Sequence, residues 1–227
     1  MLAKTPENAK HQIAIVKFAG NSTDEIGNDM YNDYYGWWNY YTYNYSQVVK
    51  GLTEVTNTSA GELKAVVDEL QPTGATRADY GMHHAAELMP QSVSGRKQIV
   101  VMFTDGEPTS TNKFENSVAN GAIAAARDLK ERGVTVYTIG MFKDADPADT
   151  SGNFNKYMHY VSSNYPSAES MSNNGGNGGN NGYYKKATGA ADLSEIFSQI
   201  TSEVGNTTVT LDSNAVMVDT VSDCYNS

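Results

Sequence analysis

The chain has 227 residues, enough for one domain with a full hydrophobic core, and its formal net charge is -10. This negative charge, with no cluster of Lys and Arg, excludes nucleic acid as the expected partner, because a phosphate-binding surface has to be basic. No apolar run reaches about 18 residues, so we expect no membrane insertion. The single cysteine, Cys224, allows no internal disulfide. A composition rich in Tyr, Asn and Thr is typical of a secreted bacterial protein, and any export signal would lie upstream of Met1.

The first part of the chain predicts two strands separated by an unusual insert. Residues 12–19 form a short apolar strand, and residues 47–54 form a second one. Between them, residues 28–46 are too polar and aperiodic for a regular element and too aromatic for a passive linker. A helix then opens at the capping box Ser59-Ala-Gly-Glu62, and Pro72 ends it.

The middle of the chain predicts helices that alternate with buried strands. The segment Gly74-Ala-Thr-Arg-Ala-Asp79 forms a turn, and a helix with an apolar Met and Ala face follows as far as Pro90. Residues 99–104 are a nearly unbroken apolar run, typical of a strand covered on both faces of a parallel sheet. A third helix ends at Gly133, and the strand 134–141 follows directly. This alternation indicates an α/β fold with a doubly wound, mostly parallel sheet.

The remainder of the chain is less regular. Residues 154–162 predict a short helix, whereas residues 164–182 contain an Asn/Gly-rich run that we expect to be mobile, with nothing in it that packs. Residues 183–187 predict an edge strand, and apolar residues at helical spacing then predict a last helix. Two short β runs follow, so we divide the chain into a domain at 1–205 and the start of a β-rich domain or tail at 206–227.

Asp105 is the first candidate for a functional residue. It comes directly after the apolar strand 99–104, which Gly106 and Pro108 stop. Ligands of open α/β sheets gather beyond the carboxyl ends of the strands, so a carboxylate there is placed for chemistry or metal binding. An ordinary Asp-Gly turn explains the same residues without any function.

The order of these elements resembles that of a von Willebrand factor type A domain across residues 10–204. The resemblance is carried by the Gly-Ala-Thr-Arg-Ala-Asp turn, the Thr-Asp-Gly that ends the central strand and the Tyr-Thr-Ile-Gly of the next strand. It implies that Thr76 and Asp105 are metal ligands, because they stand where that family places its metal-binding Thr and Asp. The Ser-Ser-Asn-Tyr-Pro at 162–166 and the Tyr-Tyr-Lys-Lys-Ala before the last helix look most like the version found in surface and pilus adhesins of Gram-positive bacteria.

The chain departs from the family pattern where the metal site should be completed. The resemblance implies an Asp-x-Ser-x-Ser loop after the first strand of the sheet, and this sequence contains neither that loop nor that strand. Mg²⁺ prefers octahedral oxygens with at least one or two carboxylates. Thr76 and Asp105 alone therefore predict a site for Mg²⁺, Mn²⁺ or Ca²⁺ that is weakened or absent in this chain. We interpret residues 1–205 as a domain that lacks its first strand and is incomplete at its N-terminus.

The resemblance implies an extracellular binding module at the bacterial cell surface or cell wall rather than an enzyme. The expected partners are a host protein or glycan, whose acidic group would reach the metal, and other pilus or cell-wall subunits. One alternative is a metal-assisted phosphoryl or ester hydrolase with Asp105 as metal ligand. The sequence lacks a second carboxylate at another strand end, a nucleophile elbow and a phosphate loop for it. The other alternative is a structural pilus subunit without a working metal.

The aromatic insert is the expected ligand surface. It leaves from the carboxyl end of the strand 12–19, which should be the same end of the sheet as Asp105. Exposed aromatic side chains anchor protein and sugar ligands because they offer large contact area at low entropic cost. The candidates are Tyr34, Tyr35, Trp37, Trp38 and Tyr40. A β-hairpin extension that packs on itself explains the same composition.

Three other residue types have ordinary explanations. His83 and His84 are adjacent on a helix and cannot both face one metal, so we expect one at the surface and one packed. Cys224 has no His nearby in sequence and lies in a tail, which disfavours catalysis. Glu107 should point away from Asp105, which disfavours a hydrolytic carboxylate pair.

The C-terminal segment offers one way to fill the missing strand. Residues 215–223 could return to the sheet beside the strand 12–19 and bring Asp219 close to Thr76 and Asp105. A separate hairpin with residues 207–211 would exclude this arrangement.

Overall fold

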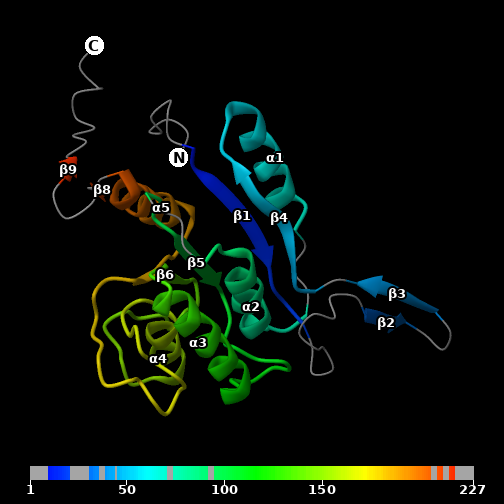
Figure 1. Cartoon of the computed structure of the whole chain (residues 1–227). Coiled ribbons are helices and arrows are strands. Elements are labelled where there is room, and N and C mark those ends of the chain that lie inside the picture. The colour runs from blue at the N-terminus through cyan, green and yellow to red at the C-terminus, as the bar shows by residue number, and fades with distance from the viewer. Residues whose placement is uncertain are drawn as a thin grey trace.

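The computed structural model describes residues 10–20, 31–35, 39–43, 45–70, 74–91, 95–205, 209–211 and 215–217. The elements in these ranges are shown in Figure 1. In chain order they are β1 (Gln12–Lys17), β2 (Tyr31–Tyr35), β3 (Asn39–Tyr43), β4 (Gln47–Glu54), α1 (Asn57–Asp68), α2 (Ala78–Leu88), β5 (Ile99–Thr104), α3 (Asn116–Glu131), β6 (Thr135–Gly140), α4 (Asn153–Val161), β7 (Tyr184–Lys186), α5 (Ala190–Gly205), β8 (Val209–Leu211) and β9 (Ala215–Met217). None of the described helices has the length and apolar character needed to cross a membrane.

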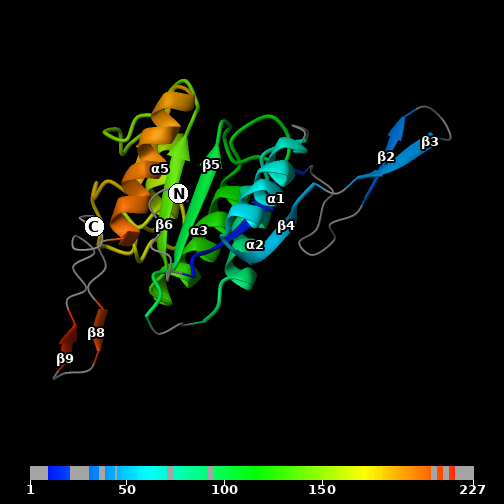
Figure 2. The same ribbon diagram turned by 90° about the horizontal axis from the view of Figure 1, so that it is seen from above.

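A parallel sheet of β5, β6 and β7 forms the centre of the fold, with β6 in the middle. The apolar side chains of α2, α3 and α4 pack with one face of this sheet, and those of α5 pack with the other. Figure 2 shows α5 and α3 on opposite sides of the strands. Parallel strands are joined by crossover helices that cover both faces, so β6 is almost completely buried. The predicted α/β fold is confirmed.

β1 and β4 form a separate antiparallel pair, which lies beside β5 in Figure 2, and α1 packs on β4. Among the described strands, neither β1 nor β5 has a second hydrogen-bonded neighbour. Met102 of β5 is buried, but Phe103 is 41% exposed. The expectation that β5 is covered on both faces is therefore wrong in part, because an edge strand lacks the side chains of one neighbour.

α1 begins earlier than its sequence pattern predicts. Thr56 is its N-cap: the Thr56 hydroxyl accepts the Ser59 N–H at 3.1 Å, and the Ser59 hydroxyl accepts the Thr56 N–H at 2.8 Å. These reciprocal bonds are a capping box in which Ser59 takes the role predicted for Glu62. Glu62 lies on the helix surface and pairs with Lys50 of β4 at 3.0 Å.

The aromatic insert contains a regular element. β2 and β3 pair antiparallel, with Tyr34 opposite Tyr40 and Tyr35 opposite Asn39. Figures 1 and 2 show this hairpin projecting away from both sheets. The prediction that the insert is too polar and aperiodic for an element is wrong, because Tyr and Thr favour extended backbone even without an apolar alternation. Two of the candidate aromatic residues lie outside the described residues, namely Trp37 and Trp38.

Part of the segment 164–182 packs on the core, contrary to the prediction that nothing in it packs, although most of the Asn/Gly run at 172–181 is exposed. Met171 is 8% exposed, and its N–H donates to Asn120 Oδ1 of α3 at 2.8 Å. Gly178 lies against the ring of Tyr165, where a Cβ would come within 2.1 Å of a ring carbon. Glycine here permits close approach of the backbone to an aromatic ring rather than flexibility. The loop is therefore anchored to the core at a few buried residues, which include Ala168 and Met171.

The buried side chain of Asn164 hydrogen-bonds to both the loop and α4. Its side chain is fully buried, and its Oδ1 accepts the N–H of Asn181 at 2.9 Å and the N–H of Tyr183 at 3.1 Å. Its Nδ2 lies 2.8 Å from Nδ1 of His159, which is also fully buried. The other ring nitrogen of His159 lies 3.1 Å from the carbonyl of Pro147. One buried amide therefore joins the start and the end of the loop to α4.

β8 and β9 form a hairpin of their own, with Val209 opposite Met217. The alternative in which residues 215–223 pair with β1 is therefore wrong. Asp219, which that alternative would have brought to the metal, lies outside the described residues. The division of the chain at residue 205 stays a prediction.

Candidate metal-binding site

β5 carries Asp105 to the carboxyl end of the parallel sheet. Thr104 is 5% exposed. Its hydroxyl donates to the Gly106 carbonyl at 3.1 Å and accepts the Gly106 N–H at 3.3 Å. The chain therefore turns sharply as soon as the strand ends, and Asp105 is exposed at that turn. An exposed carboxylate at this end of the sheet can contact a ligand directly.

The turn before α2 brings Thr76 to the same place. The Thr76 carbonyl accepts the Thr109 N–H at 3.0 Å, which joins it to the loop that follows Asp105. A Cβ built on Gly106 would lie 2.9 Å from the Thr76 hydroxyl oxygen, so a larger residue would displace that hydroxyl. The two residues that sequence reasoning selected as metal ligands thus lie on adjoining loops.

The end of β1 forms a third side of this region. The Gly20 carbonyl accepts the Ala75 N–H at 2.6 Å, directly beside Thr76. The Ser46 hydroxyl bonds both to the N–H of Ala19, at 3.1 Å, and to its carbonyl, at 2.7 Å. The segments that lead into and out of the hairpin β2–β3 are therefore fixed at the Thr76 end of the sheets.

A buried ion pair follows Thr76. The Arg77 guanidinium donates to both carboxylate oxygens of Asp79, at 2.9 and 2.7 Å, and stacks over the Tyr80 ring at 3.7 Å. Burial lowers the pKa of Arg77, but the hydrogen bond and the charge of Asp79 outweigh it, so the net shift is upward. Asp79 is 7% exposed and already paired, so it serves Arg77 rather than a metal. Sequence reasoning missed this pair.

The described side chains fit a metal site only in part. Thr76 and Asp105 offer one hydroxyl and one carboxylate, the hard oxygen donors that Mg²⁺ and Mn²⁺ prefer. No cluster of three or more His, Cys, Asp or Glu that could hold a metal occurs in the part of the chain that the structure describes. Water or a further segment would have to supply the other oxygens.

The two histidines of α2 behave as the sequence predicts. His84 is 8% exposed, whereas His83 lies at the surface with its Nε2 3.3 Å from the Glu87 carboxylate. Cys224 lies outside the described residues.

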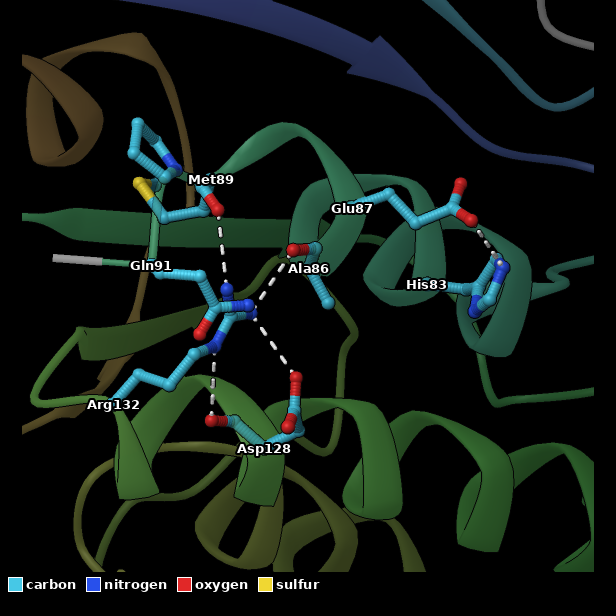
Figure 3. Close-up of a pocket in the computed structure, with 8 residues that line it drawn as sticks. His83, Ala86, Glu87, Met89, Gln91, Asp128 and Arg132 are labelled. Atoms are coloured by element: carbon cyan, nitrogen blue, oxygen red, sulfur yellow. Dashed lines mark hydrogen bonds and ion pairs between the residues drawn. The ribbon is translucent and has the colours of Figure 1, made fainter.

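A hollow of about 460 Å³ lies between the C-terminal ends of α2 and α3, as Figure 3 shows. Arg132 crosses it and donates to the carbonyls of Ala86, at 2.9 Å, and Met89, at 3.1 Å. It also pairs with Asp128 at 3.1 Å. These bonds satisfy carbonyls that α2 leaves free at its end, so Arg132 joins the two helices. The lining is His83, Ala86, Glu87, Met89, Pro90, Gln91, Asp128 and Arg132, and it includes neither predicted metal ligand.

The family model for the von Willebrand factor type A domain matches residues 36–173, more than half of the chain. The chain belongs to this family. The resemblance drawn from its turn and strand motifs is therefore confirmed. No curated protein sequence matches the chain.

Solved structures with the same fold include proteins from two bacteria. The conserved hypothetical protein BatB from Bacteroides thetaiotaomicron is 13% identical, with a TM-score of 0.51, over 88% of this chain and 82% of BatB. The pilus adhesin SpaC from Lactobacillus rhamnosus GG, in its open conformation, is 14% identical, with a TM-score of 0.52 over 85% of this chain. A second SpaC structure gives a TM-score of 0.53. The chain spans 25% of the length of SpaC. At these identities the likeness concerns the fold.

Proposed function

We propose that the chain is an extracellular adhesion module that binds a protein or glycan through a divalent cation held by Thr76 and Asp105. The contact between the two loops carries this proposal: the N–H of Thr109, on the Asp105 loop, donates to the Thr76 carbonyl at 3.0 Å. It supports a site with one neutral and one charged oxygen, where an acidic group of the ligand completes the coordination of Mg²⁺ or Mn²⁺. The likeness to a pilus adhesin supports a place among pilus or cell-wall subunits at the bacterial surface.

The remaining ligands would come from a strand that completes the sheet. β1 and β5 each lack a second neighbour among the described strands, and unpaired backbone groups are costly to bury. A strand that pairs between them, with an Asp-x-Ser-x-Ser loop at its carboxyl end, would bring further oxygens beside Thr76 and Asp105. Without it, water fills most positions around the ion and the affinity is weak.

Asp105→Ala should weaken Mn²⁺ binding by at least about tenfold, since even groups that only support metal ligands typically contribute 10–100-fold in affinity. The melting temperature should hardly change, because Asp105 is exposed and its carboxylate serves the ion rather than packing. Thr76→Ala should weaken binding less, because it removes a neutral oxygen. Calorimetric titration with Mn²⁺ measures the affinity of the wild-type chain and of both variants.

A suitable control is Asp68→Ala, which removes an exposed carboxylate at the end of α1. It separates binding at the proposed site from loose association of Mn²⁺ with an acidic surface. Equal affinity in wild type and Asp105→Ala would show that Asp105 is not a ligand.

The aromatic hairpin is the proposed ligand surface, with Tyr34, Tyr35, Trp37, Trp38 and Tyr40 as contact residues. The double variant Trp37→Ala/Trp38→Ala should lower binding to the ligand at least about tenfold with little change in melting temperature, as expected for aromatic hot spots. Binding of the intact adhesin and of its double variant to panels of matrix proteins and glycans measures the change in affinity.

The matched control is Phe197→Ala, because Phe197 is an aromatic residue of α5 that is 43% exposed. It should leave binding unchanged. A large fall in melting temperature with binding intact would identify the two tryptophans as a local core instead.

A further inference from the structure

The loop from Asp105 to α3 is held by Glu115, which is not one of the two proposed metal ligands. Glu115 stands at the N-cap of α3, where a side chain normally accepts a hydrogen bond from the first turn, but its side chain makes no capping bond. Its own N–H donates back to the Pro108 carbonyl at 2.9 Å. The carboxylate is therefore free to serve the loop before the helix.

The Glu115 carboxylate gathers donors from consecutive residues of that loop. Its Oε1 accepts from the Thr109 hydroxyl at 3.1 Å and from the N–H and the hydroxyl of Ser110, both at 3.0 Å. The Thr111 hydroxyl donates to the same oxygen at 3.0 Å, and the Ser110 hydroxyl also lies 2.8 Å from Oε2. The hydrogen bond from the Ser110 side chain is the largest reason that the pKa of Glu115 is lowered. An ionised carboxylate accepts several such bonds at once, and they hold residues 109–111 in one conformation.

Thr109 connects this brace to the candidate metal ligand. Its hydroxyl donates to Glu115 and also accepts the Thr111 N–H at 2.9 Å. Its backbone N–H donates to the Thr76 carbonyl at 3.0 Å, and the residue is 8% exposed. A continuous path of hydrogen bonds therefore runs from Glu115 through Thr109 to Thr76, while the covalent chain runs from Thr109 back to Asp105.

We propose that Glu115 is a positioning residue, which sets the distance between the Thr76 and Asp105 loops before any ion binds. This inference rests on the proposed metal-dependent function. A site whose oxygens are already ordered loses less conformational freedom when the ion arrives, so its affinity is higher than that of the same oxygens on a loose loop. Sequence reasoning did not select Glu115.

The test uses Glu115→Ala in the full chain, with Glu131→Ala as its control. Glu131 is on the same helix and makes an exposed ion pair with Arg127 at 2.7 Å. Glu115→Ala should weaken Mn²⁺ binding about tenfold, the lower end of the effect of residues that orient metal ligands. Exchange of the Thr109 amide hydrogen should become at least about tenfold faster, because its bond to Thr76 opens more often. Glu131→Ala should change neither quantity.

A conservative variant separates bracing from a general loss of structure. Glu115→Gln keeps one oxygen that can accept the same donors without the charge, so it should restore much of the protection of the Thr109 amide. Unchanged exchange of this amide in Glu115→Ala would overturn the proposal, whatever the metal does. So would unchanged Mn²⁺ affinity in Glu115→Ala while Asp105→Ala loses binding.

The two proposals fail in different ways. If the wild-type chain and Asp105→Ala bind Mn²⁺ equally, the metal site itself is misassigned. The exchange of the Thr109 amide still decides whether Glu115 joins the two loops.

Discussion

Asn164→Ala should lower the free energy of unfolding by about 2–4 kcal/mol, because leaving a buried polar group without its partner costs about 1–3 kcal/mol. The variant removes two acceptor bonds and one bond to His159 from a side chain with no exposed surface. It also leaves a small cavity beside His159. Urea unfolding followed by circular dichroism measures the change.

Asn180→Ala is the matched control, because Asn180 lies in the same loop but is exposed. Its amide nitrogen donates to the Pro147 carbonyl at 2.8 Å, a bond that water can replace. We expect a change of at most about 1 kcal/mol. If the two variants were equally stable, the loop would not depend on its buried amide.

Acid should destabilise the protein from pH 6.5 downward through His159. Because Asn164 Oδ1 accepts two backbone N–H groups, its Nδ2 faces His159, so Nδ1 of His159 accepts and Nε2 carries the proton. Burial lowers the pKa of His159, and the Pro147 carbonyl and Asp149 only partly oppose this. The unfolded chain therefore takes up a proton near pH 6.5 while the folded chain does not. The contribution of His159 to stability is complete above that pH and falls below it, by at most about 1.4 kcal/mol per pH unit.

Urea unfolding between pH 7.5 and 5 measures this fall, with His83→Gln as control because His83 lies at the surface. The carboxylates whose pKa is lowered, Glu115, Asp149 and Asp192, lose their contribution only below their ordinary values of about 4. Between pH 7.5 and 5 the free energy of unfolding should therefore fall in His83→Gln as it does in the wild type. The explanation fails if the His159 ring, followed by NMR, titrates at or above pH 6.5 in the folded protein.

The candidate site was partly visible in the sequence. Asp105 follows an apolar run, which is a local pattern, whereas Thr76 was selected because its turn resembles a motif of the family. The Arg77–Asp79 pair and the Glu115 brace were not found, because a charged residue in a sequence is equally compatible with an exposed position. Only the burial of Asp79 and the convergence of hydroxyl groups on Glu115 distinguish them from solvated charges.

The sequence by itself determined the strands and helices of the α/β core, because apolar runs and helical spacing are local properties. The strands predicted at 99–104 and 47–54 have the same bounds in the structure. The tertiary structure alone decided that Phe103 of β5 is exposed and that part of the loop 164–182 packs on the core. The contacts responsible join distant residues, as when Met171 bonds to Asn120 and Gly178 meets Tyr165. An Asn/Gly-rich composition is typical of a mobile linker, but it also permits packing where the Tyr165 ring and the buried Asn164 side chain contact the loop. No local sequence pattern predicts these contacts.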